Sequence, residues 1–235
     1  MKEMINGFKR VILAGIQPTL NFFNGDRHTQ RAVILAAWLL IFLLVLPVNV
    51  KSAIVKGVKS QDNSIFLLLL FTILSLSLLW SVGQRIDAWT FLFINLRGKR
   101  PYWLDALMLT VTQFGNGGVA LAIACFLFIF HDHRLAYTLV LGTLTLWLVV
   151  ELIKAMVHRP RPFIRLETVR IVGSPAVGRS FPSGHTSQAF FMASLFSHHF
   201  QMNLGLIVLV YLTAVLVALT RMYVGAHYPR DVLAG

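Results

Sequence analysis

Three short polar clusters lie beside long apolar stretches in the second half of the 235-residue chain. They cover residues 154–162, 181–185 and 220–231, and each contains lysine, arginine or histidine. Such side chains cost free energy next to membrane-length apolar segments, so they are usually functional. These clusters are therefore the candidates for chemistry.

The first cluster can bind an anion. Lys154 and Arg161 are seven residues apart, which is two helical turns if the helix continues, so both could reach one group. Two cations suit a dianionic phosphate, with arginine as a bidentate fork and lysine as a point charge. Taken alone, this cluster is more often a positive flank of a membrane helix, and Glu151 is expected to pair with Lys154 structurally.

The second cluster, Phe-Pro-Ser-Gly-His, is expected to open a helix. The free backbone N–H groups and the positive dipole end of a helix start can receive a phosphate oxygen. Ser183 is placed as the N-cap, and its hydroxyl could equally donate to phosphate, next to Gly184 and His185. By itself the cluster fits an ordinary helix start equally well.

The third cluster combines Arg221 with His227, six residues later, and Asp231, four residues after that. The i, i+4 spacing brings the carboxylate to the imidazole, where it fixes the tautomer and stabilises the cation formed when the other ring nitrogen attacks. Attack on phosphorus gives a phosphohistidine intermediate, which divides hydrolysis into two easier steps. A lone His-Asp pair is usually structural, so the catalytic interpretation depends on the three clusters together.

The number of membrane crossings between the clusters, here called helix parity, predicts that the three clusters share one membrane face. The helix that ends at Lys154 and the helix that begins at Ser183 meet the same face. The chain leaves that face after Ser183, returns to it at Arg221, and starts its last helix just after His227. This convergence holds whichever side of the membrane the face is on.

The three clusters together resemble the signature of the type 2 phosphatidic acid phosphatase (PAP2) family, which includes bacterial acid phosphatases and vanadium haloperoxidases. The first motif is Lys154 followed, after six residues, by Arg161-Pro162. The second is Pro182-Ser183-Gly184-His185. The third is Arg221 followed, after five residues, by His227 and, after three more, by Asp231. The family often has serine before the third-motif arginine, whereas this chain has Thr220, which keeps the hydroxyl.

The resemblance implies a role for each motif position. His227 would be the nucleophile, oriented by Asp231, and His185 would protonate the leaving oxygen and later activate water. The phosphoryl oxygens would be bound by Lys154, Arg161, Ser183, Gly184 and Arg221. The resemblance requires no metal and no cofactor, and the sequence has no evident set of metal ligands. Outside the motif positions are His158, Arg159, His198 and His199, which are expected to be interface residues.

The composition indicates that these motifs are positioned by membrane helices. Hydrophobic residues make up 57% of the chain, charged residues only 13%, and the mean hydropathy is +0.72. Residues 32–48 and 65–82 lack charge over most of a bilayer's thickness, which requires about 20 helical residues. The predicted fold class is an all-α polytopic membrane bundle, with a six-helix PAP2 core and an extra N-terminal transmembrane helix.

Further helices are expected along the rest of the chain. Residues 83–102 mix basic and aromatic side chains and suit a helix lying in the membrane interface. Residues 104–130, with a break at Gly115–Gly118, and 135–153 form one predicted hairpin, and residues 183–200 and 204–219 form another. Proline residues 160 and 162 end a helix, and residues 163–179 form an extramembrane loop.

The chain is predicted to divide into a lead-in with the extra transmembrane helix, residues 1–60, and the phosphatase core, residues 61–235. A last helix begins near Pro229 and is cut off at Gly235, which suggests a truncated chain. The single cysteine, Cys125, excludes an intrachain disulfide. The net charge of +12 does not indicate nucleic acid, because the basic residues lie in short loops beside apolar runs.

The expected substrate is a phospholipid or isoprenoid phosphate in the bilayer: phosphatidic acid, phosphatidylglycerol phosphate, a polyprenyl diphosphate or a lipid A phosphate. Two enzyme activities stay open, a lipid phosphatase and a lipid phosphotransferase, and protein partners are not indicated. The resemblance implies a bacterial cytoplasmic membrane with the site facing outward. With seven spans, however, the face with the site carries 17 of the 21 Lys and Arg residues, which points to the cytoplasm.

Overall fold

The computed structural model describes residues 34, 37–42, 44–48, 51–52, 62–78, 81–96, 100–130 and 132–235. All regular elements in these residues are helices, so the predicted all-α class is confirmed. The lead-in and the extra helix predicted for residues 1–60 lie largely outside the described residues. The division at residue 60 and the number of membrane spans therefore stay predictions.

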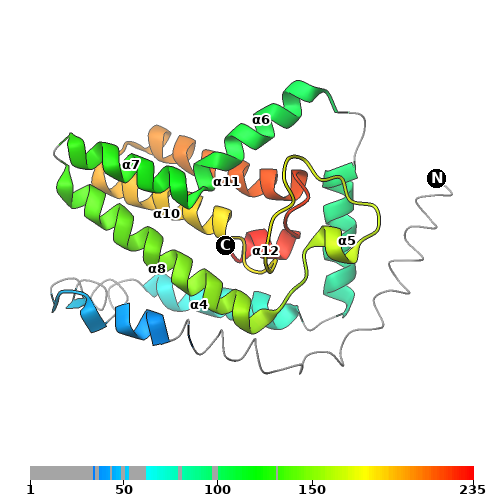
Figure 1. Ribbon diagram of the computed structural model, residues 1–235, viewed down its shortest axis with the longest axis horizontal. Coiled ribbons are helices and arrows are strands. Elements are labelled where there is room, and N and C mark those ends of the chain that lie inside the picture. The colour runs from blue at the N-terminus through cyan, green and yellow to red at the C-terminus, as the bar shows by residue number, and fades with distance from the viewer. Residues whose placement is uncertain are drawn as a thin grey trace.

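Four helices form the body of the molecule and run side by side in Figure 1. They are α7 (Gly117–Ile129), α8 (His133–Val157), α10 (Gly184–His199) and α11 (Leu204–Tyr223). α7 packs against α8, and α10 packs against both α8 and α11. Asn116, Asp132 and Asn203 cap the starts of α7, α8 and α11 by accepting a backbone N–H.

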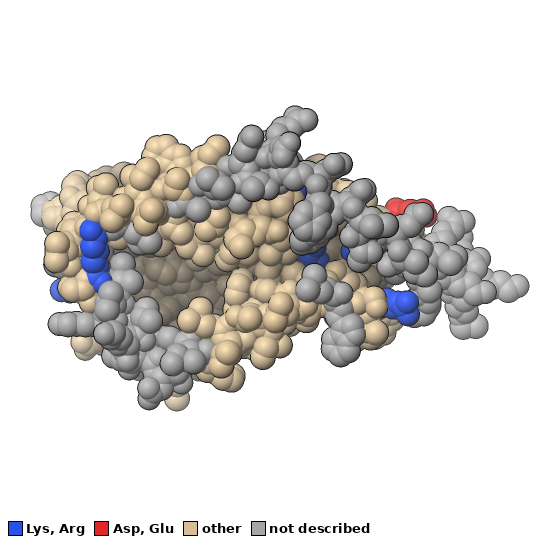
Figure 2. Space-filling model, turned by 90° about the horizontal axis from the view of Figure 1, so that it is seen from below, with Lys and Arg blue, Asp and Glu red and all other residues tan. Residues whose placement is uncertain are grey.

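The outer surface of these helices is apolar. Large side chains are more than half exposed on α7, α8 and α11, including Phe126, Trp147, Leu209 and Leu212. The segment His133–Arg165 and the helix Leu204–Tyr223 are each long and apolar enough to cross a bilayer, and two bent helix pairs could raise that number to four. The face seen in Figure 2 is almost free of described charged side chains between its two ends. A bilayer is the solvent that suits this surface.

Two helix pairs are bent rather than straight. α4 (Asp62–Ser77) and α5 (Ser81–Leu96) meet at 95°, so the apolar run 65–82, predicted to be transmembrane, reaches across a bend and its last residues belong to α5. α6 (Tyr102–Thr112) and α7 meet at 60° after the short 3-10 helix η2 (Gln113–Gly115), where the sequence predicted a break. The first bend directs α5 across the end of the bundle, next to the short helix α12 (Pro229–Leu233) (Figure 1).

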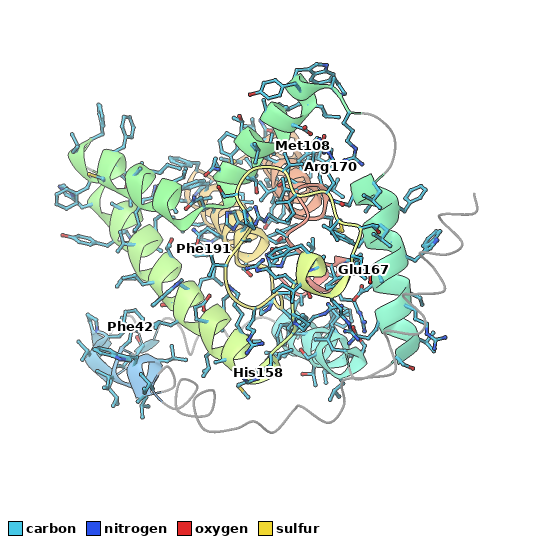
Figure 3. All side chains as sticks on the ribbon, turned by 45° about the vertical axis from the view of Figure 1, so that its right-hand side comes forward. Phe42, Met108, His158, Glu167, Arg170 and Phe191 are labelled. Carbon is cyan, nitrogen blue, oxygen red and sulfur yellow. The ribbon has the colours of Figure 1, made fainter. Side chains whose placement is uncertain are left out.

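An irregular segment covers the same end of the bundle. It contains the single-turn helix α9 (Pro162–Arg165) and then passes from Glu167 to Arg170, which lies beside Met108 of α6 in Figure 3. The side chain of Asn95 on α5 is fully buried and donates to the carbonyls of Arg170 and Tyr223, both at 2.9 Å. It also accepts the N–H of Arg170 at 2.8 Å, so one amide joins α5, the segment and α11.

Phe91 anchors α5 to the bundle end. Its side chain is fully buried, and its ring packs edge-on against Tyr228 with centroids 5.7 Å apart. We expect Phe91→Ala to lower the free energy of unfolding by roughly 3–5 kcal/mol, because it removes a buried ring and leaves a cavity. Thermal unfolding in detergent micelles measures the loss. Phe93→Ala on the same helix is the matched control, because Phe93 is 49% exposed; equal losses in the two variants would contradict the assigned packing.

Candidate active site

The three predicted motifs meet at one end of the bundle. Arg161 of the first motif places Nη1 3.2 Å from Nε2 of His227 in the third. Ser183 of the second motif donates its backbone N–H to the carbonyl of Asp231 at 2.8 Å. Segments more than 40 residues apart in sequence are thus in direct contact, as helix parity predicted.

Arg161 is positioned by the irregular chain that follows α8. The helix ends at Val157, and His158 takes a left-handed conformation with φ of 51°, so Lys154 and Arg161 do not share one continuous helix. The Arg161 side chain is buried and donates to three carbonyls: Val177 at 2.7 Å, Ala226 at 3.0 Å and Gly178 at 3.1 Å. These bonds fix the guanidinium beside His227.

Lys154 lies in the last turn of α8 and forms the expected ion pair with Glu151, with Nζ and Oε1 2.7 Å apart. Four residues earlier, Val150 packs against the start of α10, where a Cβ placed on Gly184 would lie 3.5 Å from Val150 Cγ1. Lys154 therefore lies one turn beyond this contact between α8 and the start of α10.

Ser183 is the N-cap residue of α10, as predicted, but its side chain makes no capping bond. The hydroxyl is fully buried and instead accepts from Thr186 Oγ1 at 2.9 Å. His185, the second residue of α10, borders a cavity of about 360 Å³ together with Arg221. Three other polar side chains line this cavity, Thr112, Gln113 and Ser174, and the remaining wall is mostly apolar.

Arg221 extends from the last turn of α11 and is 7% exposed. Its Nη1 donates to the hydroxyl of Thr112 on α6 at 2.7 Å. Like Arg161, it is therefore held by a neutral oxygen, and no carboxylate of the residues that the structure describes is bonded to it.

His227 and Asp231 are both buried, at 3% and 0% exposure. The distance from His227 Nδ1 to Asp231 Oδ2 is 3.7 Å, which is longer than a hydrogen bond, and among the described residues Nδ1 has no hydrogen-bond partner. The Asp231 carboxylate accepts from the backbone N–H of Tyr228 at 2.8 Å and from the hydroxyl of Ser180. His227 and Asp231 are therefore close together, as the spacing predicts, but are not joined by a hydrogen bond in this structure.

Burial lowers the pKa of His227 to about 4, because the charged imidazolium is costly without water. The Asp231 carboxylate opposes this shift, and the nearby Arg161 and Arg221 reinforce it. The ring is therefore neutral near pH 7, with one nitrogen carrying a lone pair. A neutral imidazole is the form that can act as a nucleophile.

One expectation from sequence is wrong, and one charge was missed. Arg159 was expected to be an interface residue, but it is 5% exposed and forms ion pairs with Asp231 and with Asp87 of α5, both at 2.5 Å. Asp87 lies in a basic, aromatic segment far from the motifs, so local sequence pattern does not indicate a role for it. The number of basic residues near the site indicates that acidic partners are needed, because buried cations require them. His198 and His199, by contrast, are exposed at the other end of α10.

No group of three or more His, Cys, Asp or Glu side chains among the described residues could hold a metal ion. The expectation that no metal or cofactor is needed stays a prediction.

Comparisons with known proteins agree on one superfamily. The sequence model of the PAP2 superfamily matches residues 134–235. An undecaprenyl-diphosphatase of Sulfolobus acidocaldarius is 31% identical over 174 residues, which cover 72% of this chain and 82% of that protein.

Two solved structures are similar. The crystal structure of Aquifex aeolicus LpxE has a TM-score of 0.55 and 32% identity, and the match covers 63% of this chain and 86% of that one. The first transmembrane PAP2 type phosphatidylglycerolphosphate phosphatase from Bacillus subtilis has a TM-score of 0.59, with 72% and 87% covered. At 23% identity, this second likeness concerns the fold.

The apolar helix bundle and the basic site at its end define a multi-pass membrane phosphatase. The chain belongs to the PAP2 superfamily, as the three motifs and the 31% identical relative both indicate.

Gly115, at the bend between α6 and α7, allows close contact with α10. A Cβ placed there would lie 2.4 Å from the carbonyl oxygen of His185 and 2.8 Å from Val217 Cγ1. We expect Gly115→Ala to displace the start of α10 and lower phosphatase kcat by up to about a hundred-fold, because small misplacements of reacting groups are costly. Steady-state kinetics in micelles measures this. Gly117→Ala is the control, since its Cβ would meet only Thr143 at 3.7 Å, and equal kcat in both variants would refute the contact.

The lowered pKa of His227 predicts how its ring titrates. The neutral form should persist as the pH falls through 6.5 and should be lost only near pH 4, where the ring gains its proton. NMR of ¹⁵N-histidine-labelled protein in micelles measures this midpoint, with His227→Gln assigning the resonance. A midpoint at 6.5 or above would show that the ring is not desolvated as the structure indicates.

Proposed function

We propose that this phosphatase hydrolyses a lipid phosphate through a phosphohistidine intermediate on His227. The observation that carries the proposal is the 3.2 Å approach of Arg161 Nη1 to His227 Nε2. A phosphoryl group that binds this guanidinium would lie close to Nε2, the ring nitrogen opposite the one that approaches Asp231. The desolvated ring is neutral, so its lone pair is available to attack phosphorus.

The first step forms the bond between Nε2 and phosphorus and breaks the bond between phosphorus and the leaving oxygen. His185 donates a proton to that oxygen, and the Asp231 carboxylate stabilises the positive charge that develops on the His227 ring. In the second step His185 takes a proton from water, the water oxygen attacks phosphorus, and His227 is released with inorganic phosphate. The charge that moves onto the phosphoryl oxygens is stabilised by Lys154, Arg161 and Arg221, together with Ser183 and the backbone N–H of Gly184.

The lipid nature of the substrate is supported by the surroundings of the site. Leu109, Phe163, Ile171 and Val172 line the cavity that His185 and Arg221 border, so an apolar group esterified to phosphate has matching surface there. The relative from S. acidocaldarius is named an undecaprenyl-diphosphatase. A polyprenyl diphosphate is therefore the first substrate to test, followed by phosphatidic acid, phosphatidylglycerol phosphate and a lipid A phosphate.

Full-length protein in micelles with a terminally ³²P-labelled polyprenyl diphosphate tests the reaction. We expect release of labelled inorganic phosphate and an acid-labile labelled protein after rapid quenching. His227→Ala should lose both, with activity reduced at least about a thousand-fold, because removal of a nucleophile abolishes the covalent route. His198→Ala is the matched control, since His198 is exposed in the last turn of α10.

Two results would contradict the proposal. Retained activity in His227→Ala would refute the nucleophile, and label transferred to a second lipid instead of inorganic phosphate would show a phosphotransferase. If none of the four lipid phosphates is hydrolysed while a soluble phosphate ester is, the lipid specificity is wrong.

A further inference from the structure

We propose that Arg159 is a positioning residue that fixes the carboxylate of Asp231 behind His227, and that Asp87 of α5 holds Arg159 in place. The proposal rests on the proposed function, because it assigns a task relative to the His227 nucleophile. Asp87 lies outside residues 134–235, which the superfamily model matches.

Arg159 joins two carboxylates from distant parts of the chain. Its Nη1 lies 2.5 Å from Asp231 Oδ1, and its Nη2 lies 2.5 Å from Asp87 Oδ2. The guanidinium also lies over the ring of Tyr228, 4.3 Å from the centroid. All four side chains are buried, so water does not screen these contacts. A planar fork with two terminal nitrogens can make both pairs at once, whereas a lysine ammonium is a single point charge.

The contacts of Asp231 show what Arg159 controls. Oδ1 is occupied by Arg159, and Oδ2 accepts from the Ser180 hydroxyl and the Tyr228 N–H. These three donors prevent rotation of the carboxylate and set the 3.7 Å distance from Oδ2 to His227 Nδ1. Without Arg159, Oδ1 would lose its partner and the carboxylate could turn, which would change the support of the ring during attack.

Asp87 has a second partner that provides a control. Arg230 donates its Nε to Asp87 Oδ2 at 2.7 Å and its backbone N–H to Oδ1 at 3.2 Å. The Arg230 Nη1 then reaches Ser77 at the end of α4. Arg230 therefore belongs to the same buried ion cluster as Arg159 but makes no hydrogen bond to Asp231 in the described structure.

Arg159→Lys tests the proposal, because it keeps the charge and removes the fork. We expect kcat for lipid phosphate hydrolysis to fall by roughly ten- to a hundred-fold, as small displacements of catalytic groups do. The rate of phosphohistidine formation in rapid-quench experiments should fall equally. KM and inhibition by orthovanadate, a phosphate mimic, should be unchanged, because the residues proposed to bind phosphate are untouched.

Arg230→Lys is the matched control, since it weakens the same cluster without touching Asp231. It should lower the melting temperature yet leave kcat near the wild-type value. Asp87→Asn provides a second variant that keeps an oxygen acceptor for Arg159 and removes only the charge. It should lower kcat by less than Arg159→Lys, and it keeps the test available if the lysine variant does not fold.

The proposal is overturned if Arg159→Lys and Arg230→Lys lower the melting temperature equally and leave kcat equally intact. It is also overturned if vanadate inhibition weakens in proportion to kcat, since Arg159 would then support the phosphate site rather than Asp231. The His227→Ala variant separates this failure from that of the proposed function. An active His227→Ala protein overturns both, whereas an inactive one with unchanged Arg159→Lys kinetics overturns only the role of Arg159.

Discussion

The cost of burying arginine side chains at the end of an apolar bundle is the constraint on which the rest of the structure depends. Four arginines are buried there, and they are satisfied in two different ways. Arg159 pairs with the carboxylates of both Asp87 and Asp231, and Arg230 pairs with Asp87. Arg161 and Arg221 instead donate to neutral carbonyl and hydroxyl oxygens. The first pair is neutralised by the protein itself. The second pair is hydrogen-bonded only to neutral groups, and in the proposed function a dianionic phosphate balances its charge.

The irregular segments of the chain supply the neutral oxygen atoms that accept from Arg161. Carbonyls outside regular helices are available to accept from a guanidinium, and the segment from Val177 to Gly178 and the turn at Ala226 provide them. Gly225, with φ of 87°, lets this turn approach the carbonyl of Arg170, where a Cβ would lie 2.7 Å away. The bend between α4 and α5 brings Asp87 across the bundle end. The helices determine where the site is, and the breaks between them determine which backbone oxygens face it.

Much of this arrangement could be predicted from sequence, because the lengths of apolar runs reveal membrane helices and each helix reverses the face that the chain occupies. That parity was sufficient to place His185, Arg221 and His227 at one end. It could not place Arg159, because its partners lie 72 residues away on either side and only the left-handed turn at His158 directs it inward. The spacing of Lys154 and Arg161 would equal two helical turns only if the helix continued, and the helix ends at Val157, before the prolines that were predicted to end it. Local pattern predicts helices well, but the direction of a side chain after a helix end depends on tertiary contacts.

The 3.7 Å separation between His227 and Asp231 affects the charge state of the imidazole ring. A short hydrogen bond would stabilise a protonated ring in the resting protein, whereas burial and the nearby Arg161 and Arg221 favour the neutral ring that the proposed mechanism requires. In the proposed mechanism, the carboxylate is instead held by other donors, and its attraction for the ring grows as positive charge develops there during attack. Its stabilisation is thus greater in the transition state than in the resting state, which is the condition for an interaction to accelerate a chemical step. A carboxylate that is fixed beforehand also spends no free energy on reorientation when that charge appears.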